Sequence, residues 1–249
     1  VHRYAQGPRE ALRAQAQPED PIEYPEVGLY HPQMKNRISE HLSDLPGYGR
    51  KDQPAVGLLL LRSYLLAGNT AHYDAVIHSL QARGLRVIPA FASGLDARPA
   101  MDLFFKQGTG SNIQSLVSLT GFSLVGGPAY NDASAAEVAL SELDVPYIAA
   151  HPLEFQSIEQ WGESTRGLLP VENTIMVAIP ELDGSILPMV YGGRPGPAGQ
   201  TCHGCDKRCT FPSGPRSQDM FTCSERTDML TARVERLVRL RDKPRAERK

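Results

Sequence analysis

The stretch between residues 55 and 91 constrains the fold of this chain more than any other part of the sequence. It opens with AVGLLLL, an apolar run with the length of a strand that is covered on both faces. After a polar loop comes one apolar stripe at helical spacing, formed by Tyr73, Val76, Ile77 and Leu80. RVIPAF, at residues 86–91, has the pattern of a second buried strand. Strand, helix and strand in this order predict a right-handed βαβ unit and therefore a parallel sheet.

The same alternation continues along the chain. Apolar runs predict further strands at residues 115–119, 145–149, 174–179 and 186–191. Helical spacing predicts helices at residues 35–45, 96–105, 136–143 and 224–249. The fold class that follows is α/β: an open, mostly parallel sheet with flanking helices, built from βαβ units of the Rossmann or flavodoxin kind.

We divide the chain into four regions of one structural unit. Residues 1–54 form an extended or short-helical lead-in, and residues 55–191 form the α/β core. Residues 192–223 are an irregular insertion rich in Gly, Pro and Cys, which excludes a helix or a central strand there. Residues 224–249 form a C-terminal helix. Both ends look cut, so we expect an internal segment of a larger subunit.

Composition excludes several classes of protein. The formal charge is −2 and 22% of the residues are charged, which gives no basic surface for a nucleic acid. The apolar runs are shorter than the ~18 residues that a membrane span needs, and the polar N-terminal residues do not resemble a signal peptide. We therefore predict a cytoplasmic location, with no nucleic-acid partner and no membrane span.

Polar residues gather where a ligand is expected. Ligands of parallel sheets bind at the carboxyl ends of the strands. Arg62, Ser63, Asn69 and His72 follow the first strand and are our candidate substrate-binding residues. His151 and Glu154 follow the strand at 145–149, where a proton acceptor or oxygen ligand would be useful, but each is more simply interpreted as a hydrogen-bonded structural residue.

All the cysteines of the chain lie close together in the insertion. Cys202, Cys205, Cys209 and Cys223 have the spacing C-x2-C-x3-C-x13-C. Four thiolates complete a tetrahedral zinc site, and an iron–sulfur cluster also takes four. The spacing does not choose between the two. Disulfides are disfavoured in a cytoplasmic chain, and His203, inside the Cys-x-x-Cys, is a weaker ligand candidate than the thiols.

Nucleotide-binding motifs are absent from the sequence. The glycines of LTGFSLVGGPAYND are not followed by Lys-Ser or Lys-Thr, so this segment is not a P-loop. The G-x-G that starts at Gly108 has Ile113 where a third glycine would stand. If ATP drives this protein, we expect its hydrolysis elsewhere.

Several long motifs resemble a known family. They are YPEVGLYHP, GLLLLRSYLLAGNTAHYDAVIHSLQARGLRVIPAFASGLD, VSLTGFSLVGGPAYND, LDVPYIAAHPLEFQSIEQW and VAIPELDG. They resemble the large porphyrin-binding H subunits of magnesium chelatases, whose family also includes the cobalt-inserting CobN-type chelatases. The branch looks like the bacteriochlorophyll type of photosynthetic bacteria. The resemblance runs through RVERLVRLRDKPRAERK, but the family's large subunit is several times longer than this chain.

This resemblance implies a ligase that forms nitrogen–metal bonds. The family inserts Mg2+ into protoporphyrin IX on the way to (bacterio)chlorophyll, and the partner I and D subunits form the AAA+ motor that hydrolyses ATP. The resemblance places no catalytic residue in this segment, which we expect to be inactive alone. Asn69 and His72 match the family's pattern. The plant-type pattern lacks the cysteines, which would make them a branch-specific structural or oxygen-sensing element.

Two other functions remain open at this point. The segment could be a non-catalytic scaffold, or a region of a chelatase complex that senses redox state or a metal through its cysteines; a cobalt-chelatase type is a weaker variant. Repeated βα units also occur in periplasmic small-ligand binders, but the absence of an export signal counts against that class.

Overall fold

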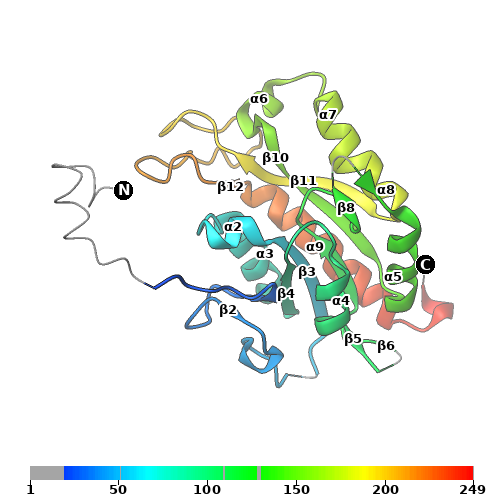
Figure 1. Ribbon diagram of the computed structural model, residues 1–249. Helices are drawn as coiled ribbons and strands as arrows, with labels where there is room; N and C mark the ends of the chain where they lie inside the picture. Colours follow the sequence, from blue (N-terminus) through cyan, green and yellow to red (C-terminus); the bar gives the residue numbers. More distant parts are fainter. Residues whose placement is uncertain (1–19, 51, 109, 128–129, 249) are drawn as a thin grey trace.

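The computed structural model describes residues 20–50, 52–108, 110–127 and 130–248. One eight-stranded sheet forms its centre (Figure 1). In spatial order its strands are β12 (Phe221–Thr222), β11 (Ile186–Arg194), β10 (Tyr147–Ser157), β7 (Ser115–Ser118), β3 (Ala55–Leu61), β4 (Arg86–Ala92), β1 (Val27–Tyr30) and β2 (Ile38–Ser39). The five strands from β11 to β4 pair in parallel, and β12, β1 and β2 pair antiparallel at the two edges. The predicted α/β fold class is confirmed.

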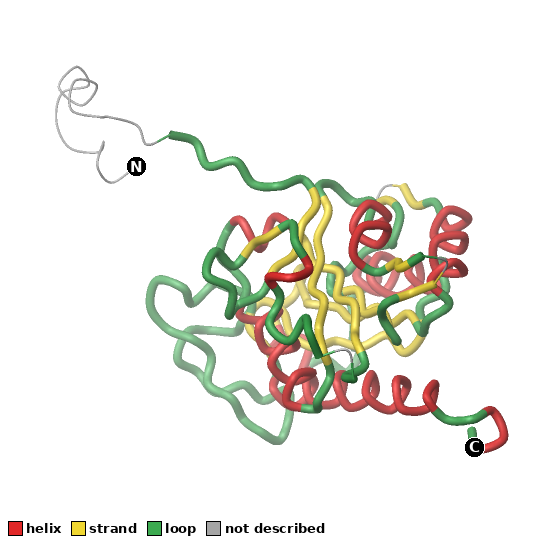
Figure 2. The backbone as a smooth tube through the Cα atoms, turned by 90° about the horizontal axis from the view of Figure 1, so that it is seen from below, coloured by secondary structure: helices red, strands yellow, loops and turns green. Residues whose placement is uncertain are grey.

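Helices cover both faces of the sheet. On one face lie α3 (Ala71–Ala82) and the long α9 (Ser224–Asp242), which pack on each other and on β3 and β11. On the other lie α4 (Arg98–Phe104) and α5 (Ala133–Leu143). Figure 2 shows the strands between α9 and the shorter helices of the opposite face. Successive residues of β3, such as Leu58 and Leu59, point to opposite faces of the sheet and belong to the two cores on those faces. Because both faces are covered, the whole strand is apolar.

The order of the strands creates a switch point. From β3 the chain passes through α3 to β4 on one side, and from β4 through α4 to β7 on the other side of β3. The chain therefore leaves β3 toward β4 and leaves β7 toward β10, in opposite directions. Open α/β sheets bind ligands between the carboxyl ends of two such strands.

Smaller elements complete the described fold. The hairpins are β5 (Lys106–Gln107) with β6 (Gly110–Ser111) and β8 (Gly126–Gly127) with β9 (Tyr130–Asn131), and the short helices are α2 (Arg62–Leu66), α6 (Ile158–Glu163) and η4 (Arg245–Glu247). The structure describes every residue that connects β11 to β12. The only β-bridge within this connection is the isolated one between Thr201 and Thr210. No helix in the described ranges is long and apolar enough to cross a membrane.

Two predicted elements are wrong. Residues 174–179 are not a strand: α7 (Pro170–Glu172), the π-helical η3 (Asn173–Ala178) and α8 (Ile179–Leu182) run on from one another. Their buried side chains, Glu172, Met176 and Pro180, recur every four residues, which is a helical period. Pro180 has no N–H to donate, and a wider π turn before it accommodates the missing bond.

The predicted helix at residues 35–45 is also absent. Ile38 instead pairs with Tyr30 across a hairpin that Arg37 closes with a positive φ of 57°, and only η2 (Leu42–Asp44) is helical, as a 3-10 turn. The lead-in thus adds two strands to the sheet. Residues 1–19 of that region lie outside the described residues.

Candidate functional site

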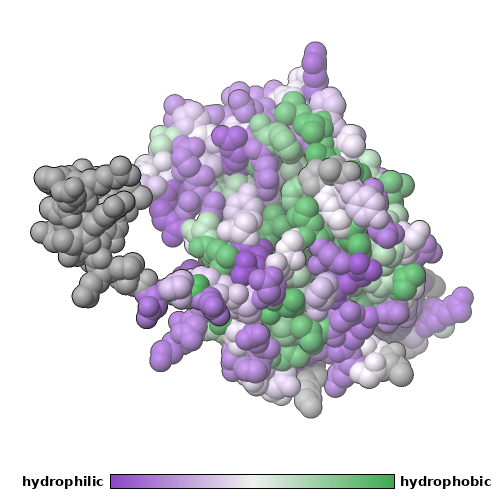
Figure 3. All heavy atoms as spheres, in the orientation of Figure 1, coloured by the Kyte–Doolittle hydropathy of each residue, from purple (hydrophilic) through white to green (hydrophobic). Residues whose placement is uncertain are grey.

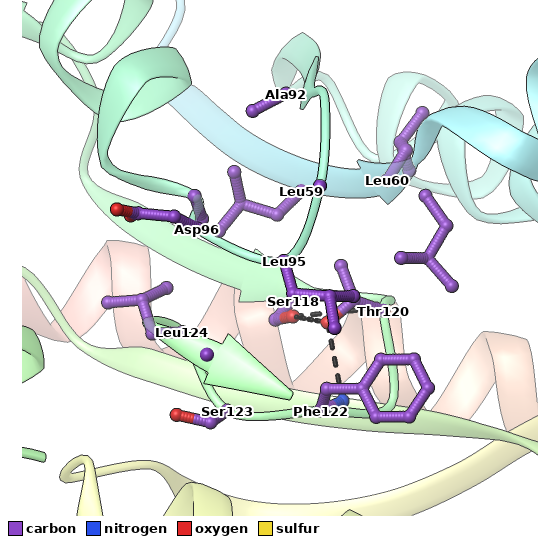
Figure 4. Close-up of a pocket in the computed structure, with 14 residues that line it drawn as sticks. Leu59, Leu60, Ala92, Leu95, Asp96, Ser118, Thr120, Phe122, Ser123 and Leu124 are labelled. Carbon is purple, nitrogen blue, oxygen red and sulfur yellow. Dashed lines mark hydrogen bonds between the residues drawn. The ribbon is translucent and has the colours of Figure 1, made fainter. Parts of the chain in front are cut away.

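A small pocket lies at the switch point, between the ends of β3, β4 and β7 (Figure 4). Its walls are mainly apolar side chains, from the strand ends and from the loops that follow β4 and β7: Leu59, Leu60, Ala92, Leu95, Phe122 and Leu124. In Figure 4, Asp96 and Phe122 lie at opposite ends of this pocket. The pocket is therefore an apolar recess with a few polar groups, which is the usual composition of a ligand site.

Two hydroxyl groups form the polar side of the pocket. Ser118 Oγ and Thr120 Oγ1 lie 2.9 Å apart and share a hydrogen bond. Thr120 Oγ1 also accepts from the backbone N–H of Phe122 at 3.4 Å, and the intervening Gly121 has a left-handed φ of 76°. These bonds fix the turn after β7 and place the Phe122 ring beside the pocket (Figure 4).

A buried carboxylate holds the wall of the pocket that Ser123 and Leu124 form. Asp183, which follows α8, accepts from Ser123 Oγ and from the Leu124 N–H, both at 2.7 Å, while its other oxygen has no described partner. Burial raises the pKa of Asp183. At the other end, the Arg98 guanidinium lowers the pKa of Asp96, which stays ionised. Polar contacts thus hold the walls of an otherwise apolar pocket.

The size of the pocket limits what can enter it. Its cavity volume is about 30 Å³, comparable with the space of one water molecule. A whole flat macrocycle does not fit, but a methyl-sized group does. The pocket can hold the rim of a larger ligand whose faces lie elsewhere.

His72 lies on the opposite face of β3, enclosed by aromatic rings. Its ring centroid is 3.9 Å from that of Tyr73, 5.2 Å from that of Tyr64 and 6.2 Å from that of Tyr191. Neither ring nitrogen has a hydrogen-bond partner among the described groups, and burial lowers the pKa of His72 to about 3. At neutral pH this imidazole is uncharged, with one nitrogen protonated as an N–H donor and the other an acceptor, and neither has a described partner.

His151 and Glu154 of β10 differ in their surroundings. Glu154 accepts a 2.8 Å hydrogen bond from the Tyr64 hydroxyl, as a structural residue would, so that interpretation is confirmed for Glu154. His151 is buried with both nitrogens unpartnered among the described groups, and burial lowers its pKa to about 3. His151 therefore lacks, among the described groups, the hydrogen bond that the structural interpretation predicted.

The other three candidate residues point away from His72. Arg62 donates to the carbonyl oxygens of Pro25 and Tyr24 and so holds the segment before β1. Asn69 Oδ1 accepts from the N–H of Met220 and ties the cysteine-rich segment to the core. Ser63 is exposed. The four residues share one end of the sheet, but their side chains do not converge on one point.

The cysteines lie in the irregular segment beside α6 and the start of α9, and one pair of their sulfurs is in contact. All four are free thiols. The Sγ atoms of Cys205 and Cys223 lie 3.7 Å apart, and the N–H of Cys202 donates to the carbonyl oxygen of Cys209. Burial raises the pKa of Cys205 to about 11. Within the described ranges, no group of three or more His, Cys, Asp and Glu side chains is arranged to hold a metal ion.

Sequence reasoning missed the pocket hydroxyls and their anchor. Ser118 and Thr120 end the third predicted strand, so the rule that led to Arg62 and Ser63 applied to them equally. Asp183 had no such signal, because it lies far along the chain and reaches the pocket wall only through tertiary packing.

Comparisons with known proteins agree on one family. A family profile described as CobN/Magnesium Chelatase matches residues 2–249. The chain is 52% identical over 235 residues to the magnesium-chelatase H subunit of Cereibacter sphaeroides, covering 92% of this chain and 19% of that protein. It is 42% identical over 202 residues to the chloroplastic magnesium-chelatase ChlH protein of Oryza sativa subsp. japonica, covering 76% of this chain and 14% of that protein.

A solved structure has the same fold. The catalytic subunit of cobaltochelatase from Mycobacterium tuberculosis matches with a TM-score of 0.64 and 19% identity, over 96% of this chain and 18% of that chain. The present chain therefore spans about a fifth of the length of these bacterial relatives.

Proposed function

The chain belongs to the CobN/magnesium chelatase family, and from this premise we propose that it is part of the porphyrin-binding subunit of a magnesium chelatase. The observation that carries the proposal is the 52% identity with a magnesium-chelatase H subunit over nearly the whole chain. The reaction would be the insertion of Mg2+ into protoporphyrin IX, in the cytoplasm of a bacteriochlorophyll-forming cell. The AAA+ I and D subunits would hydrolyse the ATP, since this sequence has no P-loop.

The chemistry sets what the porphyrin-binding subunit must provide. Mg2+ gives up its water reluctantly, and the porphyrin must release its two pyrrole N–H protons as the metal enters. The site needs an apolar slot for the macrocycle and neutral acceptors for protons. The pocket at the switch point supplies an apolar recess. His72 lies at the same end of the sheet, and its pKa of about 3 would have to rise on exposure before this imidazole could take up a proton.

We propose that the pocket receives the rim of the macrocycle. Its volume of about 30 Å³ suits one rim substituent, and Phe122 and Leu95 supply apolar contact beside it. Among the residues predicted from the sequence, His72 would be reached by the porphyrin after a movement of Tyr64. Arg62 and Asn69 would act indirectly, by holding the neighbouring segments in place. Ser63 would face the ligand from the surface.

Filling the pocket tests this proposal. Ala92→Phe places a ring at the end of β4, whereas Ala67→Phe adds the same ring at the exposed end of α2. In the full-length subunit, Ala92→Phe should weaken protoporphyrin binding by about tenfold or more, measured by the shift of the Soret band. Ala67→Phe should bind like the wild type. If both variants bound protoporphyrin as tightly as the wild type, the pocket would not be part of the porphyrin site, and the scaffold alternative would be favoured.

We also propose that the four cysteines hold zinc or an iron–sulfur cluster. In a tetrahedral site with metal–sulfur bonds of about 2.3 Å, neighbouring sulfurs lie about 3.8 Å apart. The 3.7 Å between Cys205 Sγ and Cys223 Sγ matches one edge of such a site. Bound there, the metal would help to order a segment that has few regular backbone pairings, with Cys202 and Cys209 as the remaining ligands.

Anaerobic purification distinguishes the two metals from each other and from a metal-free segment. Iron with acid-labile sulfide and a broad visible absorbance would identify a cluster, and colourless protein with one equivalent of zinc would identify a zinc site. Protein without either metal, and with four titratable thiols, would contradict the proposal. Porphyrin binding should survive Cys205→Ser, because the cysteines lie apart from the pocket.

A further inference from the structure

Arg86, the first residue of β4, lies at the amino edge of the sheet. β4 has seven residues, so this edge lies about 20 Å from the pocket at the carboxyl end. The Arg86 side chain is half-buried, and its Nε is enclosed without a hydrogen-bond partner. Among the residues that the structure describes, no carboxylate forms an ion pair with it. Burial lowers the pKa of Arg86, as expected for a guanidinium removed from water without a counter-charge.

The guanidinium lines a hollow with a cavity volume of about 380 Å³, within the usual size of a small-ligand site. Tyr48, Gln107, Asn112 and Gln114 supply polar groups to its walls. Asn112 Nδ2 donates to the Phe104 carbonyl oxygen at 2.9 Å, which fixes the orientation of the amide. Its Oδ1 is then a buried acceptor without a described partner. Arg86 Nε and Asn112 Oδ1 are thus enclosed without a described partner in two residues that line one hollow, and such unsatisfied groups are costly.

We propose that this hollow binds a carboxylate that also carries a hydroxyl or amino donor. The carboxylate would accept from the guanidinium, which matches its planar geometry with two parallel hydrogen bonds. The donor on the ligand would reach Asn112 Oδ1 after a movement of the side chains that enclose this oxygen. This site is separate from the porphyrin pocket and does not depend on it.

The charges around the hollow favour a carboxylate over a phosphate. Lys106, the other cation in the lining, already pairs with Asp102 at 2.6 Å and with Glu142. Lys106 is therefore neutralised by its partners, and Arg86 is the cation of the lining that has no described carboxylate partner. It can balance a single negative charge. A dianion would meet uncompensated repulsion from Asp102 and Glu142.

The carboxylate could belong to a free metabolite or to an Asp or Glu side chain of a longer polypeptide, and two experiments distinguish the sources. In the first, the full chain with 15N-labelled arginine is titrated with glycolate, acetate, phosphate and chloride at constant ionic strength. For a free ligand, the Nε–H resonance of Arg86 should shift saturably. Glycolate should bind about two- to tenfold more tightly than acetate, because it adds one hydrogen bond, and phosphate should bind no more tightly than acetate.

In the second, the thermal midpoint of the full-length subunit is measured for the wild type, Arg86→Gln and Arg86→Lys. Arg236→Gln, on the exposed face of α9, is the control with the same change of charge. For a free ligand, glycolate should raise the wild-type midpoint, raise that of Arg86→Lys less and leave that of Arg86→Gln unchanged. For a polypeptide carboxylate, glycolate should have no effect, but Arg86→Gln should lower the midpoint while Arg236→Gln does not.

Removing an unpaired buried cation is neutral or stabilising, whereas breaking a buried ion pair is destabilising. The proposal is therefore overturned if no probe shifts the Arg86 resonance and Arg86→Gln leaves the midpoint of the full-length subunit unchanged or higher.

Discussion

At the scale of single residues, the enclosed His72 is the least expected feature of the core. A histidine inside a protein normally satisfies at least one ring nitrogen, whereas neither nitrogen of His72 has a described partner and the ring lies among three tyrosine rings. The Tyr64 hydroxyl, which could have served it, donates to Glu154 instead. The stabilising choice at this position would be an apolar ring, so the histidine points to a role outside folding.

Replacing His72 with Phe should change how stability depends on pH. The pKa of His72 is about 3 in the folded chain and near 6.5 when unfolded, so between these values the unfolded state binds more protons. Stability therefore falls as pH falls through that window, by about 1.4 kcal/mol per pH unit for this one group. His72→Phe should lose this contribution, as measured by urea unfolding at several pH values.

Two comparisons make the His72 experiment decisive. His78→Gln, on the exposed side of the same helix, should leave the pH dependence as it is. At pH 7, His72→Phe should match or exceed the wild type in stability, because the ring stays buried and the unpaired nitrogens are gone. An equally stable variant that retains full protoporphyrin binding and turnover would exclude His72 from the site.

At the scale of elements, the cysteine-rich segment depends on a close approach to α6. A Cβ built on Gly162 would lie 2.7 Å from the Cα of Gly204, inside the Cys-x-x-Cys turn. Gly162→Ala should therefore displace that turn and reduce the metal content of purified protein, measured per chain. Gly49→Ala, where a Cβ meets nothing within 4 Å, is the matched control. Full metal content in Gly162→Ala would show that the turn does not position the ligands.

The sequence predicted elements well where burial leaves one dominant pattern. The run AVGLLLL is a strand because both of its faces are covered, and Tyr73, Val76, Ile77 and Leu80 are all buried against the sheet as their spacing indicates. The same rule gave a wrong prediction for residues 174–179, which are helical. TIMVAI is apolar enough for a strand, but the decisive residues are Glu172 and Pro180, which lie outside it and share the buried side of a helix.

The site was less predictable than the fold for a physical reason. The rim residues of β3 were identifiable from their position, but the direction of each side chain depends on partners far along the chain. Arg62 binds the carbonyl oxygen of Pro25, and Asn69 binds the N–H of Met220. The residues next to Arg62 and Asn69 in the sequence do not indicate either partner. The unpaired Arg86 has no sequence signature at all, since an arginine at a strand end is normally solvated.

At the scale of the whole molecule, the proposed function would make the described segment one wall of a porphyrin site rather than a complete slot. Apolar side chains are visible among polar ones on the face in Figure 3. Val171 of α7 and Leu182 of α8 are among the large apolar side chains that are exposed. The pocket itself admits only a group of the size of a water molecule. The relatives are about five times longer than this chain, which leaves ample protein to supply the opposite wall.

The isolated chain should therefore bind protoporphyrin weakly. If the macrocycle is clasped between this segment and the remainder of the large subunit, the chain alone loses most of the apolar area buried on binding. We expect its Kd to be at least about 100-fold higher than that of the full-length subunit, which corresponds to about 2.7 kcal/mol, measured by titration of the Soret band. The residual binding of the chain should still fall with Ala92→Phe and not with Ala67→Phe. An affinity of the chain equal to that of the full-length subunit would contradict the shared slot, because this segment would then hold the whole macrocycle, and the pocket would have to open far beyond its present volume.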